Sequence, residues 1–290
     1  TAVRFAALAR SDAELAGDAC EALIQRQLAN ADKALGTAGQ ERGARPVVTQ
    51  YELGLLNVET RFELPRIVEA LQRRGDKVSS TLCFHGLPGS GKTALAEHIA
   101  QSLQRPLMIR QTSDIASKYV GETEQNLARM FEEAQAEGAV LLLDEADSFL
   151  RSRRLAERHY EVSEVNELLQ GMERFGGVFI CTTNLFEDLD EAALRRFTFK
   201  IKFHALKAGQ RERMFVAEAL AGDATRLTAE QKSRLAQLDL LVPGDFAAVQ
   251  RQVQILALGF EPDEFLSQLE SEHRVKPEVR QRRGVGFLRQ

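Results

Sequence analysis

Apolar runs and helical repeats alternate along the middle of the chain. Short, mainly apolar runs predict strands at residues 81–85, 107–111, 140–143, 178–182 and 200–203. Between them, apolar side chains recur at spacings of three and four, which predicts helices at residues 93–103, 122–135, 162–172 and 191–195. Continuous apolar strands are typical of a parallel sheet that is covered on both faces. We therefore expect an α/β fold with a doubly wound, parallel five-stranded sheet.

The two ends of the chain follow other patterns. Residues 1–45 carry apolar positions at helical spacing, and we expect an N-terminal helical arm that packs on the main domain or on a partner. The large α/β subdomain is expected at residues 46–205. Strand patterns stop there, and residues 206–290 predict a small all-helical subdomain with a basic tail. We expect its helices to be interrupted near Gly222 and at Pro243-Gly244.

Composition narrows the class of protein. The 290 residues are 44% hydrophobic and 28% charged, which is ordinary for a globular protein. The net charge of −4 means that no global basic field favours nucleic acid as a partner. No run of 18 apolar residues occurs, so we expect no membrane span. Three scattered cysteines fit a reducing compartment, and we expect a cytoplasmic protein. A chain that begins at Thr1 is expected to be processed or to be a piece of a longer one.

A glycine-rich segment between the first strand and the first helix predicts a phosphate-binding loop. Residues 86–93 read Gly-Leu-Pro-Gly-Ser-Gly-Lys-Thr, the pattern G-x-x-x-x-G-K-[ST] in its strand–loop–helix context. Backbone N–H groups of such a loop point at one anion, and the helix N-terminus adds its positive end. Lys92 is expected on the β- and γ-phosphates of ATP, and the Thr93 hydroxyl on Mg²⁺. The candidate nucleotide contacts are Gly86, Pro88, Gly89, Ser90, Gly91, Lys92, Thr93 and Ala94.

Polar residues follow two later strands. Asp144 and Glu145 end the strand at 140–143, and we assign Asp144 to the Mg²⁺ shell and Glu145 to the base that orients the attacking water. The alternative is that both are solvated carboxylates that cap the next helix. Asn184 follows the strand at 178–182 and is a candidate for a side chain near the γ-phosphate. It can equally be a turn-forming asparagine.

Two adjacent arginines, Arg195 and Arg196, end the short helix predicted at 191–195. They can bind helix carbonyls, which is favourable at a helix C-terminus. Alternatively, one of them reaches across a subunit boundary and neutralises charge on the γ-phosphate of a neighbouring copy.

With these motifs the chain resembles the AAA clade of the AAA+ ATPases over roughly residues 50–255, with its arginine segment nearest to that of the katanin and spastin relatives. The resemblance identifies residues 86–93 with Walker A, 141–145 with Walker B and Asn184 with sensor 1. It also implies a substrate-gripping pore loop in a ring, formed here by Lys118, Tyr119, Val120 and Gly121. The basic residues 151–154 stand where the family has a second pore loop, although a solvated basic loop explains them equally well.

The chain also departs from the family pattern. Arg195 and Arg196 lack the Pro-Gly that often separates the two arginines, so either can be the finger. Pro243-Gly244-Asp245-Phe246 resembles the segment beside the adenine, which makes Gly244 a candidate nucleotide contact, and residues 54–57 are a second candidate for the adenine. No arginine-bearing sensor 2 stands out.

The resemblance implies an Mg-ATP-hydrolysing, homo-oligomeric ring, a hexamer in many relatives, that pulls a polypeptide substrate through its pore. Two other functions are compatible with the motifs. One is a nucleic-acid-associated switch of the clamp-loader or initiator type, which the acidic composition does not favour. The other is a scaffold that binds ATP without cleaving it, which the intact set of Lys92, Asp144, Glu145 and Asn184 does not favour.

Overall fold

The computed structural model describes most of the chain after the N-terminal segment: residues 53–74, 79–119, 121–150, 159–186, 189–256, 261–277 and 279–280. The expected arm at residues 1–45, Val120, the basic residues 151–154 and the tail after Arg280 lie outside these ranges. The chain divides into two compact units, residues 1–47 and residues 48–290. All the described helices and strands belong to the second unit.

A mostly parallel six-stranded sheet forms the centre of the α/β part, with the strand order β1-β6-β2-β5-β4-β3. The five expected parallel strands are present within two residues of their expected bounds: β2 (Ser80–Gly86), β3 (Leu107–Gln111), β4 (Val140–Asp144), β5 (Val178–Thr183) and β6 (Phe199–Phe203). In register, Cys83 lies opposite Cys181 and Leu141 opposite Phe179. This order brings the ends of β2, β4 and β5 together, so the motifs that follow these strands become neighbours.

The expectation of five strands is corrected by a sixth, β1 (Val58–Glu59), which pairs antiparallel with β6. A strand of two residues is too short to leave an alternating pattern in the sequence. Its register places Val58 opposite Phe203, and the His204 N–H donates to the Asn57 carbonyl at 2.8 Å just beyond it.

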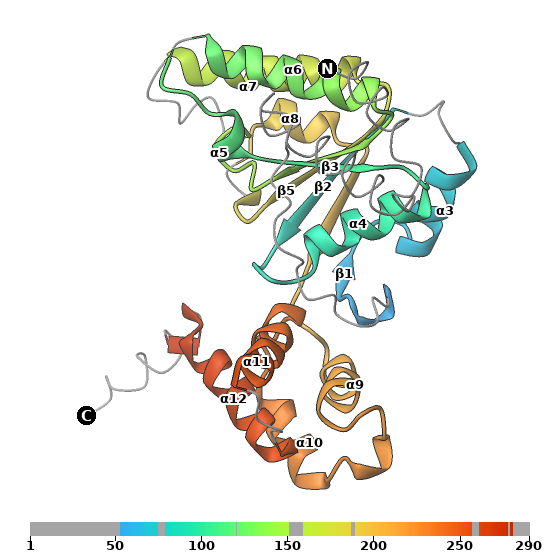
Figure 1. Ribbon diagram of the computed structural model, residues 1–290, viewed down its shortest axis with the longest axis vertical. Helices are drawn as coiled ribbons and strands as arrows, with labels where there is room; N and C mark the ends of the chain where they lie inside the picture. Colours follow the sequence, from blue (N-terminus) through green and yellow to red (C-terminus); the bar gives the residue numbers. More distant parts are fainter. Residues whose placement is uncertain are drawn as a thin grey trace, which may run out of the picture. The chain divides into compact units, whose positions relative to one another are not determined.

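Helices cover both faces of the sheet (Figure 1). On one side lie α6 (Glu122–Ala136), α7 (His159–Arg174) and α8 (Glu191–Arg196), and on the other lie α3 (Leu64–Arg74) and α4 (Lys92–Ser102). The short helices η1 (Leu53–Leu55) and α5 (Thr112–Ile115) were not expected, because three or four residues do not establish a helical repeat.

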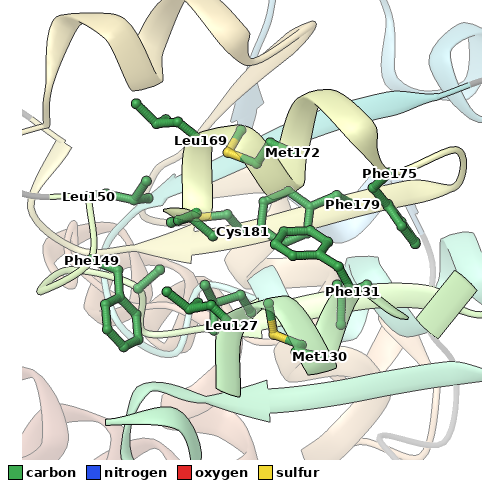
Figure 2. Packing of buried hydrophobic residues seen from close by; sticks show 14 of the residues in the cluster. Leu127, Met130, Phe131, Phe149, Leu150, Leu169, Met172, Phe175, Phe179 and Cys181 are labelled. Atoms are coloured by element: carbon green, nitrogen blue, oxygen red, sulfur yellow. The ribbon is translucent and has the colours of Figure 1, made fainter. Parts of the chain in front are cut away.

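Two apolar cores result from the alternation of side chains along the strands. Leu141, Leu143 and Phe179 face α6 and α7, whereas Leu142 and Ile180 face α3 and α4. The first core is rich in aromatic and sulfur-containing side chains, with Phe131 of α6 in contact with Phe175 and Phe179 (Figure 2). Because both faces are covered, β4 and β5 are buried along their whole length, as the apolar runs indicated.

The C-terminal part is helical in the described residues: α9 (Ala208–Ala219), η5 (Ala224–Arg226), α10 (Ala229–Gln237), α11 (Pro243–Leu256) and α12 (Pro262–Val275). Phe215, Phe246 and Phe265 lie in its own apolar core. The break expected near Gly222 is present, with Gly222 at φ +84°. The break expected at Pro243-Gly244 is present as well, since α10 ends at Gln237 and α11 begins at Pro243. Proline is favourable at this first position because the N–H that it lacks would have no partner in the first helical turn.

Candidate active site

The phosphate-loop candidate connects β2 to α4 and has the backbone that its glycines allow. Gly86, Gly89 and Gly91 have φ values of +127°, +72° and +100°, a region that disfavours other residues. A Cβ on Gly86 would lie 2.1 Å from the Phe203 carbonyl oxygen, so only glycine fits there. Gly91 is the N-cap of α4 and has no side chain to cover the helix N-terminus. The loop therefore offers a bare, positively polarised helix end to an anion.

Lys92 lies at the centre of the site with 9% of its surface exposed. Its ammonium donates to the carbonyls of Gly86 at 2.8 Å and Leu87 at 3.0 Å, and to Oδ1 of Asn184 at 2.8 Å. Burial lowers the pKa of the Lys92 ammonium, and the nearby carboxylates, Asp144 foremost, act in the opposite direction. All three protons are thus committed within the protein, and a phosphate has to replace at least one of these acceptors.

Asp144 ends β4 beside the loop, where the buried Thr182 of β5 fixes its orientation. The Thr182 hydroxyl donates to Oδ1 of Asp144 at 2.6 Å and accepts the Glu145 N–H at 2.9 Å. The other carboxylate oxygen of Asp144 lies 3.5 Å from the Thr93 hydroxyl. A hydroxyl and a carboxylate at this separation are oxygen donors of the kind that Mg²⁺ prefers.

The segment around Asn184 is tied to the end of the Asp144–Asp147 run. Asp147 Oδ1 accepts the Asn184 N–H at 3.0 Å and a hydrogen bond from the Thr183 hydroxyl. Asp147 is thereby joined to Thr183 and to the candidate sensor, while the preceding threonine, Thr182, holds Asp144. These contacts hold the Asn184 amide against Lys92.

His85, which precedes the loop, stacks on Phe186 with ring centroids 3.6 Å apart. Burial, followed by the charge of Lys202, lowers the pKa of His85 to about 4, so its imidazole is neutral at pH 7. It therefore adds no charge to the phosphate loop.

The helical part reaches the phosphate loop through Gly244. The Gly244 N–H donates to the Gly89 carbonyl at 2.8 Å, and a Cβ on Gly244 would lie 2.9 Å from the Gly89 Cα. On the other side, the Cδ2 of Leu56 lies 2.8 Å from where a Cβ on Gly91 would stand. Both segments expected near the adenine, 54–57 and 243–246, thus contact the loop.

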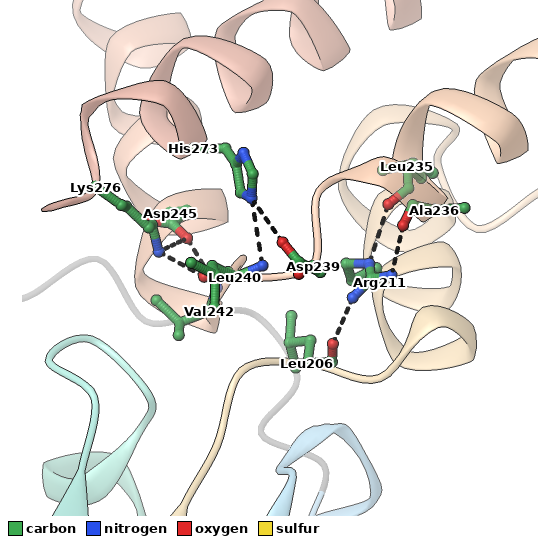
Figure 3. Close-up of polar contacts among 10 residues, drawn as sticks. All are labelled: Leu206, Arg211, Leu235, Ala236, Asp239, Leu240, Val242, Asp245, His273 and Lys276. Atoms are coloured by element: carbon green, nitrogen blue, oxygen red, sulfur yellow. Dashed lines mark hydrogen bonds and ion pairs between the residues drawn. The ribbon is translucent and has the colours of Figure 1, made fainter. Parts of the chain in front are cut away.

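A polar network positions the start of α11, and Figure 3 shows its contacts. Asp245 accepts the Val242 N–H at 2.8 Å and pairs with Lys276 at 2.7 Å, and Lys276 also donates to the Leu240 carbonyl at 2.7 Å. Because Asp245 follows Gly244 directly, these contacts hold Gly244 against the loop.

The two arginine candidates have different environments. Arg196 pairs with Glu173 of α7 at 2.7 Å and donates to the Ala192 carbonyl at 3.0 Å. Arg195 is exposed, and no described residue pairs with its side chain. Neither arginine is among the contacts of Lys92 or Asp144 given above, so the site of one chain is built without them.

The candidate substrate loop lies between α5 and α6. Tyr119 has 78% of its surface exposed, and Gly121, at φ +86°, is the N-cap of α6. The Ser117 hydroxyl contacts Glu122 and accepts the Tyr119 N–H at 3.2 Å, which anchors the base of the loop to α6. The tyrosine ring is thus presented to solvent on a fixed base.

The residues fit Mg-ATP by their own geometry: a glycine cradle, a buried lysine, and a hydroxyl opposite a carboxylate. Sequence reasoning placed Lys92, Thr93, Asp144 and Asn184 together, and the structure brings them together. It missed the threonines that orient them, such as Thr182. The available signal was a pair of polar, β-branched residues, Thr182 and Thr183, at the end of an otherwise apolar strand.

Comparisons with known proteins agree with this geometry. The family model described as "ATPase family associated with various cellular activities (AAA)" matches residues 82–205. An uncharacterised AAA family ATPase of Sinorhizobium fredii is 38% identical over 135 residues, which are 46% of this chain and 41% of that protein. A cell division cycle protein 48 homologue of Archaeoglobus fulgidus is 32% identical over 169 residues, which are 55% of this chain and 23% of that protein.

A solved structure has a similar fold. A chain of the E. coli MS115-1 HORMA:CdnC:Trip13 complex superimposes with a TM-score of 0.55 at 21% identity, covering 67% of this chain and 74% of that chain. Among the described residues, no helix combines the length and apolar character needed to cross a membrane.

Proposed function

The chain carries an ATPase domain of the AAA family, and from this premise we propose that it hydrolyses Mg-ATP in a ring of identical copies and uses the energy to remodel a polypeptide. The observation that carries the proposal is the pairing of a nucleotide site with an exposed tyrosine loop on one scaffold. The segment that leads to the loop begins at the end of β3, which pairs with β4, so substrate and nucleotide elements lie on neighbouring strands.

We assign the binding of ATP to the phosphate loop and its lysine. Backbone N–H groups of residues 89–93 and the N-terminus of α4 hold the phosphates, and Lys92 exchanges Asn184 or a loop carbonyl for phosphate oxygens. Thr93 and Asp144 are the residues that would hold Mg²⁺. When bound, the ion neutralises charge on the β- and γ-phosphates.

The hydrolytic step is assigned to residues at the ends of β4 and β5. The exposed Glu145 carboxylate orients a water and takes its proton, and the Asn184 amide holds that water or the γ-phosphate. Gly244 and Leu56 close the side of the phosphate loop on which we expect the adenine to bind.

An arginine from a neighbouring copy completes the site. We favour Arg195, because Arg196 is already paired with Glu173 and with the Ala192 carbonyl of its own chain. Arginine fingers contribute on the order of 10³–10⁵-fold in rate. Hydrolysis then requires assembly, and we propose that the ring is a hexamer. The two buried thiols, Cys83 and Cys181, are compatible with a reducing cytoplasm, which we propose as its compartment.

Tyr119 supplies the substrate contact. An exposed aromatic ring on a fixed loop offers a flat apolar surface that can hold polypeptides of many sequences, and Lys118 adds a charge for backbone carbonyls. Tyr119→Ala is expected to keep basal ATP hydrolysis and to lose unfolding of a tagged substrate protein, whereas Tyr119→Phe keeps both. Equal loss of hydrolysis and unfolding in Tyr119→Ala would contradict the substrate role.

Glu145→Gln should bind ATP without cleaving it, and rapid turnover by this variant would show that Glu145 is not the base.

A further inference from the structure

Gln210 is a buried glutamine whose side-chain amide uses both of its protons. It is the third residue of α9 and has 9% of its surface exposed. Its side-chain oxygen accepts the Lys207 N–H at 3.0 Å and so caps the helix. Its nitrogen donates to the Leu56 carbonyl at 2.9 Å and to the Gly54 carbonyl at 3.1 Å. Because the two carbonyls can only accept and the Lys207 N–H can only donate, the orientation of the amide is fixed.

The two carbonyls belong to residues 54–57, which we call the base-side segment because it is expected beside the adenine. The hydrogen bonds join it to Gln210 across more than 150 residues of sequence. The helix η1 at its start buries none of its residues, and Leu56 is the residue of the segment whose side chain enters the apolar core. Arg213 of α9 adds a second donor to the Gly54 carbonyl at 3.0 Å. The conformation of this short segment therefore depends strongly on hydrogen bonds from α9.

Leu56 connects the base-side segment to the phosphate loop. Its Cδ2 lies 2.8 Å from where a Cβ on Gly91 would stand, and its carbonyl is held by Gln210. The helical part thus acts on the loop at two points, directly at Gly89 through Gly244 and at Gly91 through Gln210 and Leu56. Both segments expected beside the adenine are positioned by contacts with the helical part.

We propose that Gln210 is a positioning residue that holds the base-side segment in the conformation that receives the nucleobase. Without its two hydrogen bonds the segment has this conformation for a smaller fraction of the time, and the apparent affinity for nucleotide falls with that fraction. An inorganic polyphosphate has no base and uses only the phosphate loop, so its affinity does not depend on Gln210. This inference rests on the proposed function, because it requires a nucleotide in this site.

The test compares Gln210→Met with Gln231→Met. Methionine is unbranched and about as long as glutamine, but its side chain donates no hydrogen bond. Gln231 is a matched control because it is also the third residue of its helix, α10, has 5% of its surface exposed, and accepts the Thr228 N–H at 3.1 Å. Its amide nitrogen donates to Asp263 of the helical part at 3.0 Å instead of to the base-side segment.

Isothermal titration calorimetry with Mg²⁺ gives the dissociation constants of ADP and of tripolyphosphate, and thermal unfolding gives the midpoint. We expect Gln210→Met to bind ADP about 2–13-fold more weakly, the equivalent of the one net hydrogen bond to Leu56, because Gly54 keeps its bond from Arg213. Its affinity for tripolyphosphate stays at the wild-type value. A role in folding alone would lower the midpoint and leave the ratio of the two constants unchanged, which is the result expected of Gln231→Met.

Two results would overturn the inference while the proposed function stands. One is wild-type ADP affinity in Gln210→Met, or an equal loss of affinity for ADP and tripolyphosphate. The other is a loss of ADP affinity in Gln231→Met as large as in Gln210→Met. If Gln210→Met does not fold, Gln210→Glu gives the same comparison, since it keeps the shape and the capping oxygen but has no proton to donate at pH 7. A wild-type protein that binds neither ligand and hydrolyses no ATP contradicts both proposals.

Discussion

Replacement of Thr182 by valine removes one hydroxyl from a buried position and tests whether that hydroxyl orients the acidic residues. Thr182 is 1% exposed, and valine has nearly the same shape. The hydrogen bond that it donates to Asp144 at 2.6 Å involves a carboxylate and contributes about 1.5–3 kcal/mol. Leaving the Glu145 N–H without its acceptor costs about 1–3 kcal/mol more.

Because both bonds share one hydroxyl, their effects are not fully additive, and we expect Thr182→Val to lower the free energy of unfolding by about 3–5 kcal/mol. Urea unfolding followed by circular dichroism at pH 7 measures the change. Thr182→Ser is the matched control, since it retains the hydroxyl and loses only a methyl group, at about 1 kcal/mol. We also expect kcat to fall more than the affinity for ATP.

The reasoning would be refuted if Thr182→Val unfolded within about 0.5 kcal/mol of the wild type, the usual range for changes at uninvolved positions. Asp144 would then have another hydrogen-bond donor, and Thr182→Val would not be more destabilising than Thr182→Ser. A serine variant as destabilised as the valine variant would show that packing of the methyl group, not the hydroxyl, is what matters.

Two further predictions concern the surroundings of the loop. Gly244→Ala places a methyl group 2.9 Å from the Gly89 Cα, and the resulting strain of about 1–3 kcal/mol should weaken ATP binding at least fivefold in isothermal titration. Gly209→Ala, where a Cβ meets nothing within 4 Å, is its control, and equal affinities in the two variants would contradict the contact. The pKa of His85 is lowered to about 4, so its neutral form contributes stability that is complete above pH 6.5 and is lost as the pH falls towards 4. His85→Phe should therefore lose stability less steeply on acidification, by up to about 1.4 kcal/mol per pH unit, and parallel urea curves for the two proteins would show that His85 does not titrate as described.

Sequence patterns predicted the sheet well because its strands are buried on both faces. A strand such as β4 has to be apolar throughout, and that leaves a continuous run. The two residues of β1 carry no such signal, because their place is set by pairing with β6 (Phe199–Phe203), which is distant in the sequence. Pro243 does mark the interruption between α10 and α11, but the residue alone does not say that it begins the second helix.

The candidate site shows the same division. Lys92 and Asp144 stand in motifs with fixed spacing, so their chemistry can be predicted from local sequence. Thr182 acts through its contact with Glu145, which lies more than 30 residues away. Such contacts are set by strand order, which no local pattern specifies. Arg195 and Arg196 likewise read as equivalent until the pairing of Arg196 with Glu173 separates them.

The most direct test of the account concerns its claim that each nucleotide site uses an arginine from a neighbouring copy. Glu145→Gln and the double variant Arg195→Ala, Arg196→Ala are each expected to hydrolyse ATP at a small fraction of the wild-type rate. When the two are mixed and reassembled, some interfaces combine an intact Glu145 with an intact arginine from the next copy, and the account predicts that ATP hydrolysis returns. A mixture no more active than its components, or an arginine variant that is fully active alone, would contradict it.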